Sequence, residues 1–453
     1  MDDDRLVGRL LMLVRQNVYA SSARVMLVVF AGLIIVGTAL LMLPIATVAP
    51  GGARLLDALF TATSATCVTG LVVQDTATYW TPFGHAVIIT LIQLGGLGLL
   101  TSVFFMRKLA NTGKSIARRN VVREAIAAPQ IGGIDKLTHF ILHTVVVCEV
   151  AGMVLSAPVF VAEYGLLGGI PRAAFHSVSS FCNAGFDVLG GHGEYTSLMP
   201  YSSNAYLLIV TSALIVMGGI GFITWDDIRT YGHRWKRYCL QTKLVLVGTA
   251  VLFVVPLVLF AFVEFSGLPL GERILTSFFC TVSPRTAGFA SVDYGQMSEA
   301  GRMLTSMLML VGGAPGSTAG GIKVTTFMVV LFASRAVMLR RKETTAFKRT
   351  IATEAIQKAL GFFVVYAGLL FAGSLVMSTI EGLPVVDTMF ECASALATVG
   401  LTTGITPTLS GVSKLLLVGF MYFGRIGGMT MAYALARPDG RLGRYPTEHV
   451  NVG

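Results

Sequence analysis

Long apolar runs recur along the chain and decide its structural class. Eight of them approach or exceed the ~20 residues that an α-helix needs to cross the hydrocarbon core of a bilayer. They lie near residues 23–43, 83–106, 139–162, 205–224, 243–264, 301–334, 356–380 and 412–436. Of the 453 residues, 54% are hydrophobic and only 13% are charged, whereas about a quarter of the residues of a soluble domain are charged. The pattern predicts an all-α, multi-pass integral membrane protein.

Four shorter, half-apolar pieces lie between the long runs. There is one inside each pair of runs, at residues 55–66, 171–182, 272–283 and 385–396. At about 1.5 Å per residue, a helix of this length reaches only about halfway across a bilayer. We therefore expect re-entrant helices, which enter and leave the membrane on the same side, between eight spanning helices.

Lysine and arginine residues concentrate in five segments. The N-terminal segment carries four, and the others carry seven, five, seven and three: 107–136, 229–243, 335–358 and the C-terminal tail. All five fall on one side of the membrane if the eight long runs span it and the four short pieces do not. The positive-inside rule makes that side cytoplasmic, so both termini are expected there, in a plasma (inner) membrane. Topology therefore explains the net charge of +10, and we do not expect nucleic-acid binding.

A fourfold repeat connects the runs and the short pieces. Each short piece is followed by a glycine, and ten residues before each glycine stands a phenylalanine: Phe60 and Gly70, Phe175 and Gly185, Phe278 and Gly288, Phe390 and Gly400. A serine lies five or six residues before each glycine, and the next long run carries paired glycines in QLGGLG, VMGGIG, LVGGAPG and GRIGGM. Such self-similarity indicates repeated structural units, here helix, half-helix, glycine turn and helix.

The repeat divides the chain into six segments. Residues 1–22 form a cytoplasmic N-terminal segment, in which leucines and arginines at helical spacing predict an amphipathic helix at the membrane interface. The first pore repeat follows, then the second, third and fourth repeats, each with its preceding loop, and finally a cytoplasmic tail: 23–108, 109–228, 229–336, 337–436 and 437–453.

Only the glycine is common to the turns that follow the half-helices. The residues before it are CVT, CNA, RTA and ATV, which indicates a site built from backbone. Irregular backbone at membrane depth must be buried or line a watery cavity, and glycine lets successive carbonyls turn toward one axis. Rings of carbonyl oxygens replace the hydration shell of an alkali cation. We therefore predict a cation pore whose filter comprises Thr66, Cys67, Val68, Thr69, Gly70, Cys182, Asn183, Ala184, Gly185, Arg285, Thr286, Ala287, Gly288, Ala397, Thr398, Val399 and Gly400.

These motifs carry a family resemblance over nearly the whole chain. FTATSATCVTGL, FHSVSSFCNAGF, FFCTVSPRTAGF and FECASALATVGL resemble the four pore-loop motifs of the Trk/Ktr/HKT superfamily of cation transporters. GGAPGSTAGGIKVTT (312–326) and FGRIGGMT (423–430) resemble its signatures in the third and fourth repeats. Eight runs without an additional N-terminal pair resemble KtrB-type potassium uptake subunits more than TrkH.

The resemblance implies potassium uptake by a homodimer in which each protomer has its own pore, with K+ coordinated at Gly70, Gly185, Gly288 and Gly400. It also implies regulation by a cytoplasmic, nucleotide-binding ring of the KtrA type. Glycine in all four loops resembles the potassium-preferring members, since sodium-selective relatives carry serine in the first loop. Membrane lipid surrounds such a protein, and no covalently bound cofactor is expected. The sequence leaves open whether Na+ acts as an activating or coupled ion.

The sixth long run is interrupted by VGGAPGSTAGG at 311–321. Five glycines and a proline in eleven residues prevent a regular helix. The segment lacks the Lys-Ser/Thr pair of a phosphate-binding loop, and the resemblance implies an intramembrane loop that obstructs the pore. Arg425 lies mid-span, roughly 16 Å along a helix from the nearest basic residues, where a charge is functional by default. The predicted gate comprises Gly312, Gly313, Gly316, Ser317, Thr318, Gly320, Gly321, Lys323 and Arg425.

Three alternatives to a gated pore are considered. A sodium-coupled potassium symporter would use the same chain, and a secondary transporter of another solute would also use broken helices, but usually in two inverted halves. A membrane-embedded enzyme would need clustered acid–base or metal-binding groups. Glu149 and Glu391 are isolated in the sequence, and His139 with His143 is a weak metal signal.

Two acidic residues have equivalent positions after the glycine turns. Asp75 and Asp293 each lie five residues after a predicted filter glycine. Carboxylates at the mouth of a pore raise the local concentration of cations, so we expect these two residues at the outer entrance.

The topology predicts which introduced cysteines a membrane-impermeant thiol reagent reaches in intact cells. Gly113→Cys and Gly440→Cys should resist labelling because their segments face the cytoplasm, whereas Gly191→Cys should react. The unmodified chain, with its six cysteines, is the control for background labelling. Labelling of Gly113→Cys from outside would show that the span assignment is wrong.

Overall fold

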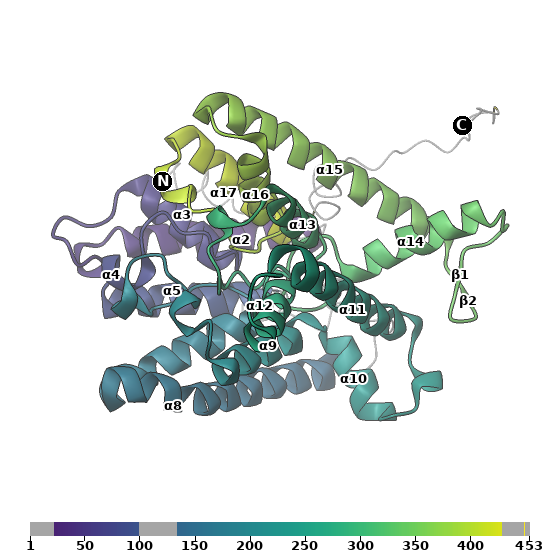
Figure 1. The fold of residues 1–453 in the computed structure, drawn as a ribbon, viewed down its shortest axis with the longest axis horizontal. Coiled ribbons are helices and arrows are strands. Elements are labelled where there is room, and N and C mark those ends of the chain that lie inside the picture. Colours follow the sequence, from purple (N-terminus) through teal and green to yellow (C-terminus); the bar gives the residue numbers. More distant parts are fainter. Residues whose placement is uncertain (1–21, 99–133, 428–447, 449–453) are drawn as a thin grey trace, which may run out of the picture.

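The computed structural model describes residues 22–98, 134–427 and 448, which are almost entirely helical (Figure 1). The α-helices are α2 (Ser22–Leu41), α3 (Leu55–Thr66), α4 (Thr76–Tyr79), α5 (Pro82–Gly96), α8 (Ile134–Cys182), α9 (Ala205–Gly219), α10 (Phe222–Tyr231), α11 (Leu240–Leu259), α12 (Leu270–Val282), α13 (Glu299–Leu310), α14 (Val324–Met338), α15 (Thr353–Glu381), α16 (Val385–Leu396) and α17 (Gly411–Ile426). The strands β1 (Thr345–Ala346) and β2 (Arg349–Thr350) pair antiparallel between α14 and α15. Tighter or wider turns link the helices: η1 (Pro44–Ala46), η2 (Gly190–His192), η3 (Met199–Tyr201), η4 (Trp235–Arg237), η5 (Phe260–Glu264), η6 (Tyr294–Gln296) and η7 (Thr406–Thr408). The expectations for the N-terminal segment, most of the 107–136 loop and the tail lie outside the described residues.

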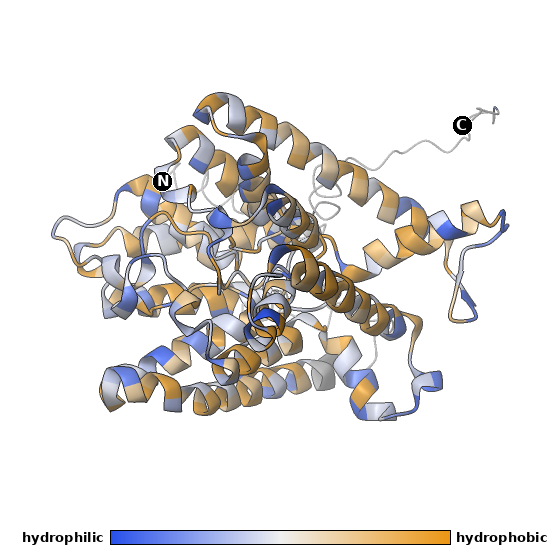
Figure 2. Cartoon of the chain, in the orientation of Figure 1, coloured by the Kyte–Doolittle hydropathy of each residue, from blue (hydrophilic) through white to orange (hydrophobic). Residues whose placement is uncertain are grey.

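Three described helices are long and apolar enough to cross a membrane: Thr138–Cys182, Leu240–Glu264 and Thr353–Glu381. The bent pair Ala205–Gly219 and Phe222–Tyr231 makes a fourth if it is counted as one span. Figure 2 shows hydrophobic residues along α8, α11 and α15, and hydrophilic residues at the hairpin and at the connection between α10 and α11. The chain is therefore a helical, multi-pass membrane protein, as predicted.

Glycines shorten several of the predicted spans. The run 205–224 bends by 94° between α9 and α10, where Gly221 has a φ of 88°. The run 301–334 is divided into α13 and α14 by the glycine-rich segment, and α17 ends before Gly427, whose φ is 88°. A positive φ is incompatible with a right-handed helix. The arrangement of eight full spans therefore stays a prediction.

The short helices occur where the sequence predicts them. α3 and α16 match residues 55–66 and 385–396, and α12 begins two residues and ends one residue before the predicted piece. The piece 171–182 is not separate, but is the last part of α8, which is broken at Gly165 (φ 71°, ψ 174°). Ser177 Oγ donates to the carbonyl of Glu149 at 2.6 Å. The two parts of α8 therefore fold back against each other around one glycine.

The third short helix is shifted by one residue relative to the others. The predicted phenylalanines of the other three repeats are buried, but in the third repeat the fully buried ring is Phe279, and Phe278 is only partly buried. Four residues after that ring stands Ser283, five rather than six residues before Gly288. The predicted match of Phe278 is therefore wrong by one position, because the third loop is one residue shorter.

In three repeats a glycine lets the second long helix approach the end of the short helix. A Cβ added to Gly95, Gly218 or Gly424 would collide with a backbone carbonyl at that end, that of Thr66, Phe181 and Leu396 respectively. Only glycine permits so close an approach of two backbones. Helix packing therefore explains the first glycine of the pairs at 95–96 and 218–219, whereas Gly424 has the same contact but is followed by Arg425 and precedes the pair in GRIGGM.

In the third and fourth repeats, the second long helix begins with the same pair of hydrogen bonds between a serine and a glutamate. Glu264 accepts hydrogen bonds from the N–H and the hydroxyl of Ser298 at 2.8 and 2.5 Å, and Glu381 accepts the same pair from Ser410 at 3.0 and 2.5 Å. Each serine also caps its helix, α13 or α17, and such a cap stabilises a helix by about 1 kcal/mol. The sequence repeat is therefore matched by a repeat of contacts.

Two contacts illustrate how segments that are distant in the sequence meet. Tyr422 Oη on α17 donates to the carbonyl of Leu27 on α2 at 2.7 Å, which closes the fourth quarter of the chain onto the first. The rings of Trp235 and Phe347 lie 6.2 Å apart, so two of the basic segments meet at one end of the molecule, on the right of Figure 1. The predicted topology requires those two segments to share a side.

Candidate functional site

Four loops, which we call the glycine loops, follow the short helices and meet in a ring: 66–70, 182–185, 285–288 and 397–400. A Cβ added to Gly70 would lie 3.1 Å from Cα of Gly185, and one added to Gly185 would lie 2.9 Å from Cα of Gly288. The same construction gives 3.1 Å from Gly288 to Gly400 and 2.9 Å from Gly400 to Gly70. The four glycines therefore follow one another around a closed ring in chain order, with no space for a side chain.

Each glycine loop has the same backbone. In each loop the glycine and the residue two before it both have a positive φ. The values are 58° for Val68 and 94° for Gly70, 60° for Asn183 and 67° for Gly185, 69° for Thr286 and 81° for Gly288, and 53° for Thr398 and 98° for Gly400. This conformation costs a non-glycine residue about 1–2 kcal/mol, so the surroundings must impose it four times. The N–H before each glycine helps, because it donates to a serine carbonyl of the short helix at 2.7–3.0 Å: Thr69 to Ser64, Ala184 to Ser179, Ala287 to Ser283 and Val399 to Ser394.

The side chains of the glycine loops are buried in the protein. Among the described residues, the hydroxyl groups of Thr66, Thr69 and Thr398 have no hydrogen-bond partner. A buried polar group without a partner costs about 1–3 kcal/mol. The guanidinium of Arg285 leaves the loop and donates to the carbonyl of Gly312 at 3.1 Å.

Residues 311–323 form a loop with a closed base, as the glycines predict. The N–H of Gly312 donates to the carbonyl of Ile322 at 2.9 Å, and the N–H of Ile322 donates to Leu310 at 3.0 Å. Lys323, a predicted gate residue, donates to a carbonyl of the loop itself, that of Ala319, at 2.6 Å. The base of this intramembrane loop is therefore held by its own backbone.

The far part of the intramembrane loop touches the ends of two other repeats. Thr318 donates through Oγ1 to the carbonyl of Phe181 at 3.1 Å and through its N–H to Gly218 at 3.2 Å. Gly320 packs so closely against Thr398 that a Cβ would collide with its hydroxyl. The predicted gate residues therefore lie directly beside the second and fourth glycine loops.

Arg425 connects the intramembrane loop to the first repeat. Its guanidinium donates to the carbonyl of Thr318 in the loop, and to those of Gly95 and Gly96 at the end of α5. Arg425 follows Gly424 as Gly96 follows Gly95, so the fourth repeat carries an arginine where the first repeat has glycine. The predicted mid-membrane charge is thus satisfied by backbone carbonyls of two other repeats.

Acidic residues follow the glycine loops in the chain, at the ends that we expect to face outward. Asp75, predicted at the mouth, caps α4 and accepts from the N–H of Tyr195 at 2.9 Å, while Asp293 caps η6. Both therefore hold turns in place. Burial raises the pKa of the Asp187 carboxyl to about 6, and the charge of Asp75 adds to the rise, although the N–H of Leu189 opposes it. At neutral pH most of this carboxyl stays ionised, so a negative charge lies close after the second glycine loop.

Two carboxylates that the sequence shows as isolated are bonded in the structure. Glu391 on α16 is fully buried and accepts hydrogen bonds at 2.6–3.0 Å from three threonines, Thr402, Thr403 and Thr406. It thereby ties the fourth short helix to the segment that follows the fourth glycine loop. The Sγ of Cys182 lies 3.9 Å from Oε1 of Glu149. The run of threonines after Gly400 was the available signal for the first of these contacts.

His139 and His143 are exposed on α8. In residues 22–98 and 134–427, no three histidine, cysteine, aspartate or glutamate side chains are placed to hold a metal ion. The pair therefore has no third ligand in that part of the chain.

Known proteins resemble the chain over nearly its whole length. Residues 14–445 match the family described as "TrkH: Cation transport protein". The chain is 42% identical to the potassium/sodium uptake protein NtpJ of Enterococcus hirae, with 93% of this chain and 95% of the relative covered. It is 38% identical to the Ktr system potassium uptake protein B of Bacillus subtilis, with 93% and 94% covered.

A solved structure shows the same fold. The potassium transporter TrkH of Vibrio parahaemolyticus superposes with a TM-score of 0.71 at 18% identity, over 92% of this chain and 84% of that one. The ring of glycine loops therefore sits in a fold that a cation transport protein also has. The sequence match and the two relatives show that this chain belongs to the TrkH family of cation transport proteins.

Proposed function

We propose that this chain takes up K+ across the plasma membrane through a pore lined by the four glycine loops. In this proposal each of four repeats contributes two spanning helices, one re-entrant short helix and one glycine loop, which makes eight spanning helices. The observation that carries the proposal is the closed ring of four glycines with the same left-handed backbone in every loop.

The backbone chemistry of the ring suits an alkali cation. Left-handed residues at alternate positions turn successive carbonyls to one side, and four loops supply rings of oxygens that replace a hydration shell. The short helices end beside the loops, and the C-terminus of a helix carries a partial charge of about −0.5. The unpartnered hydroxyls of Thr66, Thr69 and Thr398 are further oxygen ligands.

The names of two relatives support K+ as the transported ion. One relative is a potassium/sodium uptake protein and the other is a potassium uptake protein of a Ktr system. Glycine at all four ring positions also favours K+, because a side chain would alter the carbonyl geometry. Sodium-coupled potassium symport is the second candidate, and the potassium/sodium uptake name favours it.

The intramembrane loop is the gate in this proposal. It lies beside the second and fourth glycine loops through Thr318 and Gly320, and Arg425 holds it to the first repeat. A partner can bias such a gate only if its two states differ by a few kcal/mol. A glycine-rich loop tied by a few hydrogen bonds meets that requirement better than a regular helix.

Regulation comes from outside the chain in this proposal. Relatives named as parts of a Ktr system support a second, cytoplasmic component, for which we propose a nucleotide-binding ring of the KtrA type. The basic segments that meet at Trp235 and Phe347 supply a cationic face for it. We also propose a homodimer with one pore in each protomer and both termini in the cytoplasm.

Transport by the purified chain tests the proposed function directly. Reconstituted alone in proteoliposomes, it should carry K+ without any added organic solute, and adding the cytosolic subunit should make that flux depend on nucleotide. Removing Na+ separates the two candidates, because a channel-like pore keeps its K+ flux and a sodium-coupled symporter loses it. Absence of K+ flux contradicts the pore, and nucleotide dependence of the chain alone contradicts the regulatory partner.

The ring glycines should set ion discrimination. Gly70→Ser should lower K+/Na+ discrimination by about tenfold, which is about 1.4 kcal/mol, because a side chain displaces the neighbouring loop, and the other three glycines should behave alike. Gly404→Ser is the matched control, since Gly404 has the same φ of 94° but nothing within 4 Å of an added Cβ. Competition of Na+ with K+ flux measures the effect. Unchanged discrimination in all four ring variants would exclude these loops as the filter.

Weakening the intramembrane loop should open the pore. Arg425→Ala removes a charged hydrogen bond to the loop, worth about 1.5–3 kcal/mol, and should raise partner-independent K+ flux by roughly tenfold or more, as should deletion within 313–320. K+/Na+ discrimination should stay nearly unchanged. Lys414→Ala is the control, because Lys414 also lies on α17 and bonds a carbonyl, that of Pro407, at 2.9 Å. A folded deletion variant with lower flux or unaltered partner control would place the gate elsewhere.

A further inference from the structure

The third glycine loop has the only charged side chain in the four loops. Three residues before the ring glycine stand Cys67, Cys182, Arg285 and Ala397. A guanidinium directed at the ring axis would repel a cation strongly, because charge interactions are large in a medium of low dielectric constant. The side chain of an arginine at this position must therefore point away from the ring axis.

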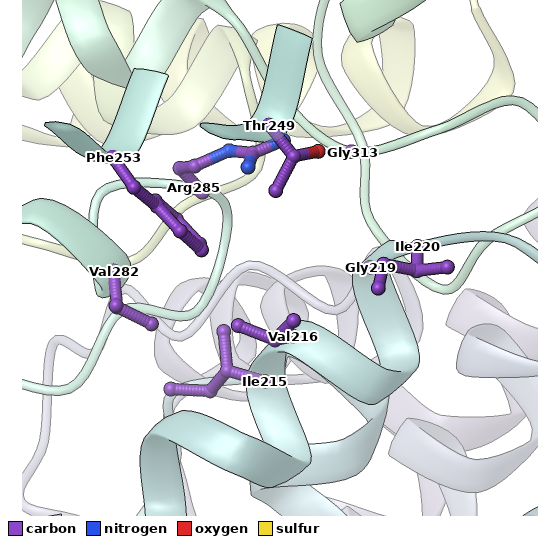
Figure 3. Close-up of a pocket in the computed structure, with 9 residues that line it drawn as sticks. All are labelled: Ile215, Val216, Gly219, Ile220, Thr249, Phe253, Val282, Arg285 and Gly313. Atoms are coloured by element: carbon purple, nitrogen blue, oxygen red, sulfur yellow. The ribbon is translucent and has the colours of Figure 1, made fainter. Parts of the chain in front are cut away.

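The structure turns this arginine toward the intramembrane loop. Arg285 is only 7% exposed. Its Nη2 donates to the carbonyl of Gly312 at 3.1 Å, and its Cζ lies 5.0 Å from the ring centroid of Phe253 on α11. Figure 3 shows the side chain extending past Phe253 and Thr249 toward Gly313. The third glycine loop and the intramembrane loop are thus joined by one side chain.

The bend after α9 makes room for so large a side chain. At the equivalent place of the second repeat, a Cβ added to Gly96 would lie 2.7 Å from Sγ of Cys182, so a larger residue could not fit there. Beside Arg285 the chain bends by 94° after Gly219, and a small cavity opens, lined by Gly219, Thr249 and the arginine itself (Figure 3). The third repeat therefore accommodates an arginine that the second repeat would exclude.

Few other groups compensate the charge of Arg285. The ion pairs found in the described part of the chain are His192–Glu163 and Arg302–Asp387, and Nε of Arg285 has no hydrogen-bond partner there. A buried cation is costly in a membrane protein. Its described polar contact with the protein is the carbonyl of Gly312, so any movement of Gly312 changes the position of the arginine.

Gly312 is the first residue at the closed base of the intramembrane loop. Its N–H donates to the carbonyl of Ile322 at 2.9 Å, and its own carbonyl accepts from Arg285. Both backbone polar groups of Gly312 are therefore bonded. Arg285 itself stands three residues before Gly288 in the ring, next to Thr286 with its left-handed φ of 69°. A displacement of the loop base is therefore transmitted over a single hydrogen bond to strained backbone of the ring.

We infer that Arg285 is a positioning residue that couples the intramembrane loop to the third glycine loop. When the loop moves, the Arg285–Gly312 bond changes and so does the carbonyl geometry near Gly288. By the reciprocity of linked equilibria, ion occupancy of the ring biases the loop to the same extent. The inference rests on the proposed function, in which the ring is a filter and the loop is a gate.

A double-mutant cycle tests this coupling. Arg285→Gln and a deletion within 313–320 are made singly and together in the full chain and reconstituted with and without the cytosolic subunit. Arg285→Gln alone should raise partner-independent K+ flux and lower K+/Na+ discrimination, each by about tenfold, equivalent to about 1.4 kcal/mol. In the deletion background it should add little to the flux, since interacting residues are non-additive.

Arg273→Gln is the matched control. Arg273 lies on α12, the short helix that precedes the third glycine loop. Its Cζ lies 4.9 Å from the ring centroid of Phe262, and its Nε has no partner in the described residues. It therefore reproduces the loss of a cation–π contact without the bond to the loop. It should leave flux, discrimination and partner control unchanged. Arg285→Lys keeps the charge and one donor and should restore part of both properties.

The outcomes distinguish the inference from the proposed function. If the unmodified chain carries no K+, both the proposed function and the inferred coupling are wrong. If the unmodified chain carries K+ but Arg285→Gln equals Arg273→Gln, or its effects add fully to those of the deletion, the coupling alone is wrong. If Arg285→Gln fails to fold, Arg285→Lys replaces it in the double-mutant cycle. The inference is overturned if the effects of Arg285→Lys and of the deletion on flux add fully.

Discussion

The structure depends on how backbone polar groups are satisfied where no bulk water is available. Within a membrane each unpaired N–H or carbonyl costs several kcal/mol, so irregular backbone needs a partner for every group. In each glycine loop the N–H before the ring glycine bonds to a serine carbonyl at 2.7–3.0 Å. In the proposed function the carbonyls of the ring coordinate a ligand that replaces water. An alkali cation is such a ligand, so the proposal gives these carbonyls a partner that the protein backbone does not supply.

The four sequence repeats differ at a few positions, and two of these differences place an arginine beside the intramembrane loop. Gly95, Gly218 and Gly424 fill equivalent places against the ends of the short helices, but the residue after the last of them is Arg425. The residues three before the ring glycines are small in three repeats and arginine in the third. Both arginines bond the intramembrane loop, at Thr318 and at Gly312. Both departures from the repeat therefore involve the intramembrane loop.

Buried carboxylates also pair with hydrogen-bond donors in the segments that follow the glycine loops. Glu391 gathers hydroxyl and backbone donors from the segment after the fourth glycine loop, and Asp75 accepts from the N–H of Tyr195 in a different repeat. These bonds hold the segments that follow the glycine loops in place by charge-assisted hydrogen bonding, while the two arginines hold the intramembrane loop.

Much of this protein could be inferred from one-dimensional pattern. Span length, charge bias and the spacing of Gly70, Gly185, Gly288 and Gly400 predict the membrane class, the short helices and the ring, because local periodicity and backbone freedom act over a few residues. The register error at Phe278, the fold-back at Gly165 and the partners of Glu391 needed the folded chain. So did the direction of Arg285, since a side chain at one position can point to either side of its loop. Which contacts it makes depends on the free space left by α9, and that space arises only when helices far apart in the sequence pack together.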